Sequence, residues 1–232
     1  MSTVSLLTGG KDSTYATYKA IKNSKKVKAA ITMLSKNSES YMYHTRNIRA
    51  AELVSEAMDL PYFSFETEGE KEEELEDLKE ALKHVRDRID FNFLVSGAVK
   101  SSYQQSRLQK VCDELSLDLY SPLWGQDEEE LLREMVDSGF EIMITEVAAG
   151  GMEEDYLGKK ITHSFIDELV ELNEEYGVSI VGEGGEFETF VLDAPIFEKK
   201  IKVKESEKKF DESTFSGSFL IKKTEFIDKK RG

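Results

Sequence analysis

Short β-prone runs alternate with longer helical stretches from Thr3 to about Tyr120, and this alternation restricts the fold more than any other feature of the chain. Four apolar runs have the length and composition of strands, at residues 3–7, 28–34, 61–67 and 91–97. Helical periodicity fills the spaces after them, at residues 13–23, 45–59, 71–88 and 101–116. Strands that alternate with helices predict βαβ units, right-handed crossovers and a doubly wound, mainly parallel sheet of the Rossmann-like α/β class.

The acidic stretch at residues 68–88 has the composition of a disordered charged segment, but its apolar residues are regularly spaced. Leu75, Leu78, Leu82, Val85 and Ile89 follow one another at intervals of three and four. That spacing predicts a helix with one buried face and one solvated, charged face, with no role in function.

The pattern changes near the segment LYSPLWGQD, where Pro122, Trp124 and Gly125 interrupt the periodicity. Beyond it we expect an acidic helix at residues 127–139, a strand at 140–151, a helix at 164–176 and a lysine-rich β tail. We therefore predict two domains, a doubly wound α/β domain at residues 1–122 and a smaller α+β domain at residues 123–232.

Charge and cysteine content exclude several classes of function. The 31 basic and 46 acidic residues give a net charge of −15, so no global positive field attracts nucleic acid or an anionic membrane. The single cysteine, Cys112, excludes an internal disulfide and a cysteine-only metal cage. No apolar run approaches the roughly 18 residues of a membrane span. We expect an unprocessed cytoplasmic protein with no stable nucleic-acid partner and no membrane segment.

The segment SLLTGGKDST, residues 5–14, lies where a phosphate-binding loop has to lie, after a predicted strand and at the start of a helix. Gly9 and Gly10 let the backbone approach an anion, Lys11 adds a positive charge, and Ser13 and Thr14 supply hydroxyls. A plain turn with Asp12 or Ser13 as the helix N-cap is the alternative. The segment is neither a Walker A loop, which needs Ser or Thr directly after its lysine, nor a dinucleotide loop with three spaced glycines.

This loop resembles the S-G-G-x-D-S loop of the ATP pyrophosphatases, the PP-loop family, with Thr8 in place of the usual serine. The resemblance implies a Rossmann-like PP-loop fold, cleavage of ATP between its α- and β-phosphates, and Mg²⁺ as a second cofactor. It also implies that Asp12 is a metal ligand and that the nucleotide is bound by a set of residues from three loops: Thr8, Gly9, Gly10, Lys11, Asp12, Ser13, Met33, Leu34, Gly97 and Ala98.

Four further segments resemble the diphthine–ammonia ligases, and together with the loop they cover most of the chain, from Ser5 to about Pro195. In chain order they are SYMYHTRNIRAAELVSEAM, LVSGAVKSSYQQSRLQKVC, PLWGQDEEELLREM and GEGGEFETFVLDAP. The resemblance implies ATP-dependent amidation of diphthine on elongation factor 2, through an acyl-adenylate, with AMP and pyrophosphate as the other products. The sequence has no cysteine at its start that would hydrolyse glutamine, so we expect free ammonium to supply the nitrogen.

The segment GEGGEFETF brings together Glu183, Glu186 and Glu188, which are the candidate catalytic residues. Neighbouring carboxylates can bind magnesium, orient ammonia or take up a proton. A glycine turn with solvated acids that opens a strand is the alternative. The resemblance implies that this segment faces the site where the substrate carboxylate is activated, with Gly184, Gly185 and Thr189 binding the substrate.

The segment SGAVKSSYQQSR ends a predicted strand at Gly97 and Ala98 and starts a helix near Ser101. This is the edge of the sheet at which open α/β proteins bind ligands, so Tyr103, Gln104 and Arg107 are candidates for contact with phosphate or substrate. The alternative is a serine N-cap followed by a surface arginine.

His44, just before a predicted helix, is a further candidate for substrate binding. Backbone groups around Met33 and Leu34 are expected to bind adenine.

Two other functions remain open from the residues alone. One is a PP-loop enzyme that modifies tRNA, although the single cysteine and the net charge of −15 argue against it. The other is a non-catalytic adenine-nucleotide sensor, which would not need the glutamate-rich segment or a second domain. A homo-oligomer is compatible with the sequence, which does not determine the number of subunits.

Overall fold

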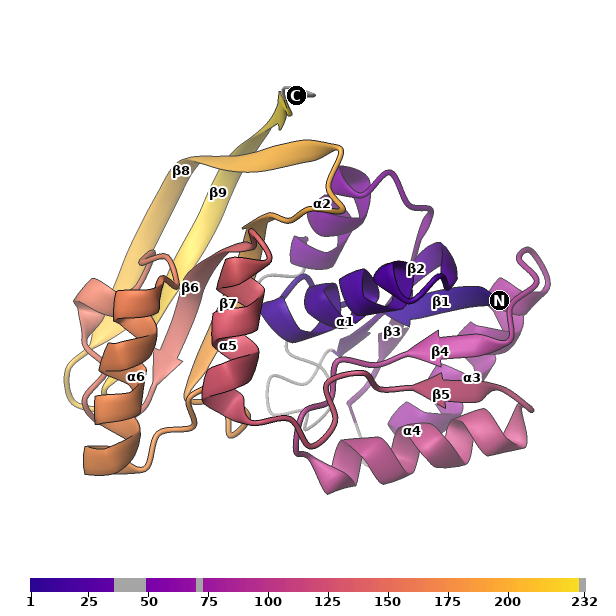
Figure 1. Cartoon of the computed structure of the whole chain (residues 1–232), viewed down its shortest axis with the longest axis horizontal. Helices are drawn as coiled ribbons and strands as arrows, with labels where there is room; N and C mark the ends of the chain where they lie inside the picture. The colour runs from indigo at the N-terminus through magenta and orange to yellow at the C-terminus, as the bar shows by residue number, and fades with distance from the viewer. Residues whose placement is uncertain (36–48, 70–72, 230–232) are drawn as a thin grey trace. The chain divides into compact units, whose positions relative to one another are not determined.

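A computed structural model describes residues 1–35, 49–69 and 73–229 of the chain. It divides into two compact units, Met1–Trp124 and Gly125–Gly232. Figure 1 labels the helices and strands of both units. Each unit has its own sheet and its own helices, and each is described separately below.

The first unit is built on a parallel sheet of five strands in the order β3-β2-β1-β4-β5. This confirms the predicted doubly wound parallel sheet. From the central strand β1 the chain first builds outward through β2 and β3, and then returns to the other side of β1 to add β4 and β5. The order of the strands thus reverses between β1 and β4, which is the point where open α/β sheets bind ligands. The strands are β1 (Ser2–Leu6), β2 (Lys26–Ser35), β3 (Tyr62–Thr67), β4 (Phe93–Val95) and β5 (Asp118–Tyr120).

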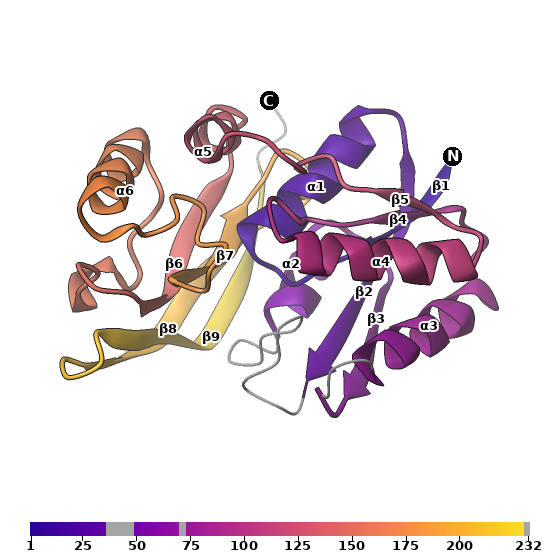
Figure 2. The same ribbon diagram turned by 90° about the horizontal axis from the view of Figure 1, so that it is seen from below.

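Helices cover both faces of this sheet, as alternate residues of β1 show. Val4 belongs to an apolar cluster with β2, β4 and two helices, α3 (Glu73–Arg86) and α4 (Ser102–Glu114). Ser5, on the opposite face, lies 2.6 Å from the Thr17 hydroxyl of α1 (Lys11–Lys22). Figure 2 shows α1 on one side of the sheet and α3 and α4 on the other. A further helix of this unit, α2 (Ala50–Ala57), contacts β3.

The acidic stretch forms α3, which confirms the predicted amphipathic helix. Leu75, Leu78, Leu82 and Val85 are buried in the core cluster, and Ile89 packs against it. The exposed face carries the charges, including a Lys83–Glu80 ion pair of 2.7 Å one turn apart. Burial of one apolar face therefore stabilises the helix despite its many acidic residues.

Cys112 lies on the buried face of α4, fully covered by this core. Burial, with smaller contributions from Asp113 and Asp118, raises the pKa of its thiol to about 12. Because the thiolate is the reactive form, we expect the native protein to be inert to an alkylating thiol reagent at mildly alkaline pH. Mass analysis before and after denaturation checks this: the adduct should form only in the unfolded chain, and rapid labelling of the native protein would contradict the burial.

The second unit has an antiparallel sheet in the order β7-β6-β9-β8. Two helices, α5 (Glu128–Asp137) and α6 (His163–Tyr176), contact each other and lie on one side of the sheet in Figure 2. They bury Leu131, Leu132 and Met135 from α5 and Phe165 and Leu169 from α6. The strands are β6 (Glu141–Ala148), β7 (Phe187–Asp193), β8 (Lys199–Asp211) and β9 (Ser216–Asp228), with a short 3-10 helix, η1, at Glu154–Tyr156.

The lysine-rich tail forms the long β8–β9 hairpin, as the predicted β-rich pattern suggested. Its two strands pair along their whole length, whereas only the Ser216–Ser218 end of β9 also pairs with β6. Cross-strand ion pairs such as Lys222–Glu207 balance part of the charge. Within the described residues, no helix combines the length and the apolar character that crossing a membrane requires.

Candidate functional site

The loop between β1 and α1 presents backbone amides at the centre of the first sheet. Gly9 has φ +86°, and a Cβ at this position would lie 2.5 Å from the backbone carbon of Ala50, the first residue of α2. Gly10 is the N-cap of α1 and has no side chain to cover the helix end. First-turn N–H groups lack acceptors within the helix and carry the positive end of its dipole, so this loop has the form of an anion site.

Hydroxyl groups hold the loop in this shape. The Thr8 N–H donates to Ser13 Oγ at 3.1 Å, and the two side-chain hydroxyls lie 3.0 Å apart. The Thr14 hydroxyl donates to the Gly10 carbonyl at 2.8 Å. Threonine and serine carry their hydroxyl on the same carbon. The threonine at position 8 therefore keeps the hydroxyl that contacts Ser13, although the PP-loop family usually has serine here.

Lys11 and Asp12 form an ion pair at the start of α1, with 2.8 Å between Lys11 Nζ and Asp12 Oδ2. Lys11 is buried, so its charge is held at the loop. The other carboxylate oxygen, Asp12 Oδ1, is buried and has no hydrogen-bond partner among the described residues. An unsatisfied carboxylate oxygen beside an anion site fits a magnesium ligand.

In the described residues, no three His, Cys, Asp or Glu side chains gather to hold a metal ion. Magnesium in nucleotide sites usually takes one or two carboxylates and completes its shell with phosphate oxygens and water. A single carboxylate such as Asp12 therefore suits a Mg²⁺ ion that is coordinated mainly by the nucleotide and water. It does not suit an ion that is coordinated by protein side chains alone.

The loop after β4 lies directly against the first turn of α1. A Cβ at Gly97 would lie 2.6 Å from the Ser13 nitrogen and 2.7 Å from the Asp12 carbonyl carbon. Ala98 is buried, and its N–H donates to Ser96 Oγ at 3.2 Å. The structure thus brings Gly97 and Ala98 to the loop that holds the other predicted nucleotide-binding residues.

The backbone of β2 turns the two predicted adenine contacts toward different neighbouring strands. Leu7 N–H donates to the Ile31 carbonyl, so Ile31 and, two residues on, Met33 turn their peptide groups toward β1. Because β1 ends at Leu6, the Met33 groups lie beyond that strand. Leu34 turns its peptide groups the other way, toward β3, where it stands opposite Glu66. Met33 is therefore better placed than Leu34 to bind a base.

The first turns of α4 carry the predicted substrate-binding side chains of this unit. Ser101 caps the helix by accepting from Gln104 N–H at 3.4 Å, as the capping alternative expected. The Arg107 guanidinium stacks over the Tyr103 ring at 3.6 Å from its centroid. These residues are partly buried and share one end of α4. His44, the remaining candidate, lies outside the described residues.

In the second unit, the glutamate-rich loop closes around one of its own carboxylates. Glu186 Oε1 accepts from the Ser179 N–H at 3.1 Å, and Glu186 Oε2 accepts from the Gly184 N–H at 2.8 Å. A Cβ at Gly184 would lie 2.8 Å from Glu186 Oε1. A glycine at position 184 is therefore what allows the carboxylate to fold over the loop.

The other candidate residues of this unit lie on either side of Glu186. The Glu183 N–H donates to Ser179 Oγ at 3.2 Å, and its side chain is partly buried. Glu188 is the second residue of β7 and stands opposite Glu146 of β6, and the buried Thr189 stands opposite Ile144. Gly185 has φ +84° and is exposed, as the turn requires.

The structure adds two residues that sequence reasoning missed. Glu128, at the start of α5, accepts from the Ser179 hydroxyl at 2.9 Å and from the Val181 N–H at 3.3 Å, both through Oε2. Glu128 is one of three successive glutamates, and Ser179 lies in an unremarkable stretch 51 residues away. No local pattern in the sequence distinguishes either of them.

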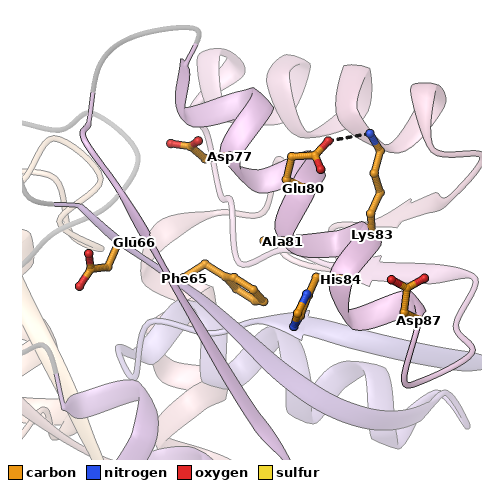
Figure 3. A pocket seen from close by; sticks show the side chains of 8 residues that line it. All are labelled: Phe65, Glu66, Asp77, Glu80, Ala81, Lys83, His84 and Asp87. Carbon is orange, nitrogen blue, oxygen red and sulfur yellow. Dashed lines mark hydrogen bonds and ion pairs between the residues drawn. The ribbon is translucent and has the colours of Figure 1, made fainter.

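An acidic groove of about 420 Å³ lies elsewhere in the first unit, between β3 and α3. Figure 3 shows the Phe65 and His84 rings on its floor and the Glu80–Lys83 ion pair at its side. The two rings meet edge to face at 5.5 Å. None of the predicted site residues lines this groove, so it is separate from the nucleotide loop.

Both units match models of one protein family. The diphthamide synthase N-terminal domain matches residues 1–119, and the diphthamide synthase C-terminal domain matches residues 127–227. The chain is 38% identical to the diphthine–ammonia ligase of Homo sapiens in an alignment of 226 positions that covers 89% of this chain and 84% of the human protein. The Danio rerio ligase is 38% identical in an alignment of 219 positions that covers 87% of this chain and 86% of that protein.

Two more distant matches extend the comparison. The Saccharomyces cerevisiae diphthine–ammonia ligase is 34% identical over 85% of this chain, which corresponds to only 34% of the yeast protein. Among solved structures, a predicted subunit of tRNA methyltransferase from Methanocaldococcus jannaschii aligns with a TM-score of 0.43 and 15% identity. That alignment covers 84% of this chain and 98% of the archaeal one.

Proposed function

The chain belongs to the diphthamide synthase family, and on this premise we propose that it is a ligase that converts diphthine to diphthamide. The observation that carries the proposal is the 38% identity to diphthine–ammonia ligase over 89% of the chain, which spans both units. The anion-binding form of the loop before α1 supports the use of ATP. We further propose that the protein substrate is elongation factor 2.

The reaction requires activation because a carboxylate is a poor electrophile and its oxygen is a poor leaving group. We propose that the diphthine carboxylate attacks the α-phosphorus of ATP, which releases pyrophosphate and forms an acyl-adenylate. Ammonia then attacks the acyl carbon, and AMP departs as the amide forms. The sum is ATP, diphthine and ammonium giving diphthamide, AMP, pyrophosphate and protons.

The geometry of the first unit supports the nucleotide-binding roles that we propose. The amides after Gly9 and Gly10 and the hydroxyls of Thr8 and Ser13 bind the departing pyrophosphate, which carries the charge that develops in the reaction. Mg²⁺, held by Asp12, would neutralise part of that charge. Met33 binds adenine through its backbone. Gly97 and Ala98 pack against the phosphate-binding loop and line one side of the nucleotide site.

We propose that Glu183 and Glu188 bind ammonium and take up its proton as it becomes the nucleophile. Glu186 acts with them, and its carboxylate also fixes the backbone that carries Glu183. Tyr103, Gln104, Arg107 and His44 are proposed to contact the substrate, together with a second set from the glutamate-rich segment: Gly184, Gly185 and Thr189.

Nucleotide analysis tests the proposed function. The purified protein is incubated with Mg²⁺, ATP, ammonium and diphthine-bearing elongation factor 2, with each component omitted in turn, and the products are separated by chromatography. AMP and pyrophosphate that depend on the factor support the ligase. ADP and phosphate would contradict it, bound but uncleaved ATP would indicate a sensor, and AMP that depends on added tRNA would indicate RNA modification. Glutamine in place of ammonium tests the nitrogen source.

Glu186→Gln tests the glutamate-rich loop. The substitution replaces one of the two carboxylate oxygens by an amide NH₂, which cannot accept a hydrogen bond. One of the two hydrogen bonds, from the Ser179 N–H or from the Gly184 N–H, is therefore lost. We expect amidation to fall by about tenfold or more, since one hydrogen bond to a charged group contributes about 1.5–3 kcal/mol, while the dissociation constant for ATP stays within a few fold. Glu171→Gln, on the exposed surface of α6, is the control. Full amidation by Glu186→Gln would remove this residue from the site.

A further inference from the structure

We propose that Glu128 and Ser179 are positioning residues, which hold the glutamate-rich loop in the conformation in which Glu183 and Glu186 act. The inference rests on the proposed function, because it assigns a role within the amidation site. It also assigns Glu128, in the acidic segment at the start of α5, a role beyond helix formation.

Ser179 connects three glutamates through its own polar groups. Its hydroxyl donates to Glu128 Oε2 at 2.9 Å and accepts from the Glu183 N–H at 3.2 Å. Its backbone N–H donates to Glu186 Oε1 at 3.1 Å. Ser179 thus joins the start of α5 to Glu183 through its side chain and holds Glu186 through its backbone.

Glu128 contacts the loop, whereas a different residue caps its helix. The N-cap of α5 is Asp127, whose side chain accepts from the Glu130 N–H at 3.0 Å. Glu128 instead directs Oε2 to the Ser179 hydroxyl and to the Val181 N–H, at 2.9 and 3.3 Å. A negatively charged side chain in the first turn also interacts favourably with the positive end of the helix dipole.

Hydrogen bonds, more than apolar packing, determine the shape of this loop. Between residues 179 and 186 only Val181 is buried, and Gly184 and Gly185 are exposed. Gly182 and Gly185 have φ +71° and +84°, so the backbone makes two left-handed turns without side chains to anchor it. The contacts of Glu128 and Ser179 are therefore among the restraints on this loop, and their loss would let Glu183 and Glu186 move.

The first test compares two substitutions of Ser179. Ser179→Ala removes the hydroxyl, and Ser179→Thr keeps it. We expect Ser179→Ala to lower kcat for amidation about tenfold or more, as the loss of a hydrogen bond to a charged group predicts, with the ATP dissociation constant within about twofold. Ser179→Thr should recover most of the rate. If the alanine variant does not fold, Ser179→Cys, which has similar size but a weak hydrogen-bonding group, replaces it.

The second test uses Glu128, with a control on the same turn of α5. Gln has a carbonyl oxygen that can take the place of Oε2 and accept both hydrogen bonds, so Glu128→Gln should retain most of kcat, whereas Glu128→Ala should lose it. Glu130→Ala, at an exposed position one residue beyond Glu129, should leave kcat unchanged. Wild-type kcat in folded Ser179→Ala and Glu128→Ala, or an equal loss of ATP affinity and kcat, would overturn the positioning role.

Amide hydrogen exchange separates this inference from the proposed function. In Ser179→Ala the Glu183 N–H loses its acceptor, so the Glu183 and Gly184 amides should exchange faster than in the wild type, while amides of α6 do not change. This readout does not need turnover. A wild-type protein that forms no amide would refute the proposed function, whereas unchanged exchange or unchanged kcat in Ser179→Ala would refute the positioning role alone.

Discussion

Asp12→Asn should lower the rate of amidation about 10²–10³-fold, the scale of losing a preorganised group that stabilises charge in the transition state. Asp12 Oδ1 is buried without a hydrogen-bond partner among the described residues, so it is free to bind a cation. An amide is a weaker ligand for Mg²⁺ than a carboxylate. Pyrophosphate release measured over a range of Mg²⁺ concentrations should show both a lower maximum and a higher Mg²⁺ requirement.

The change at Asp12 also affects Lys11, because the ion pair between them is lost and Lys11 is buried. Thermal unfolding of the variant shows whether the fold survives this loss. Asp59→Asn is the matched control, since Asp59 is exposed and has φ +55°, a conformation that asparagine also adopts. A wild-type rate with an unchanged Mg²⁺ requirement in Asp12→Asn would contradict the metal role.

Gly97→Ala should weaken ATP binding and destabilise the first unit. The added Cβ would lie 2.6 Å from the Ser13 nitrogen and 2.7 Å from the Asp12 carbonyl carbon, and neither backbone atom can move without displacing the start of α1. Overpacking of this kind costs about 1–3 kcal/mol of folding free energy. Because the displaced amides are the proposed pyrophosphate ligands, we expect a fall in ATP affinity of about tenfold or more, measured by calorimetry with a non-hydrolysable analogue.

Gly150→Ala is the control for Gly97→Ala. A Cβ at Gly150 would meet only a ring carbon of Tyr176, at 3.8 Å, which is an ordinary van der Waals distance. This variant should bind ATP like the wild type. Wild-type affinity in Gly97→Ala would show that the loop after β4 does not shape the nucleotide site.

The parallel sheet could be predicted because each of its first strands is an apolar run followed by a periodic helix. The edge strand β5 was missed because it has three residues, of which Asp118 is exposed and Leu119 only partly buried. So short a segment shows no alternation. The alternative of an N-cap at Asp12 or Ser13 was wrong, because Gly10 adopts the extended cap conformation and α1 begins at Lys11.

The candidate site was predictable to the extent that its residues are close in sequence. Gly9, Gly10 and Ser13 form one turn between a strand and a helix, and Glu183 and Glu186 flank one glycine pair. The approach of Gly97 to Ser13 and the contact of Glu128 with Ser179 join residues far apart in the chain. Such contacts depend on how strands and helices pack, which local periodicity does not specify.

The central claim, that this chain forms the amide of diphthine, is tested most directly by the mass of the protein substrate. Purified protein, ATP, Mg²⁺ and isotopically heavy ammonium are incubated with diphthine-bearing elongation factor 2, and the modified peptide is analysed. The account predicts replacement of the carboxyl hydroxyl by one heavy amino group, only when ATP and the enzyme are both present. An unchanged peptide, under conditions in which the Homo sapiens diphthine–ammonia ligase modifies it, would contradict the account.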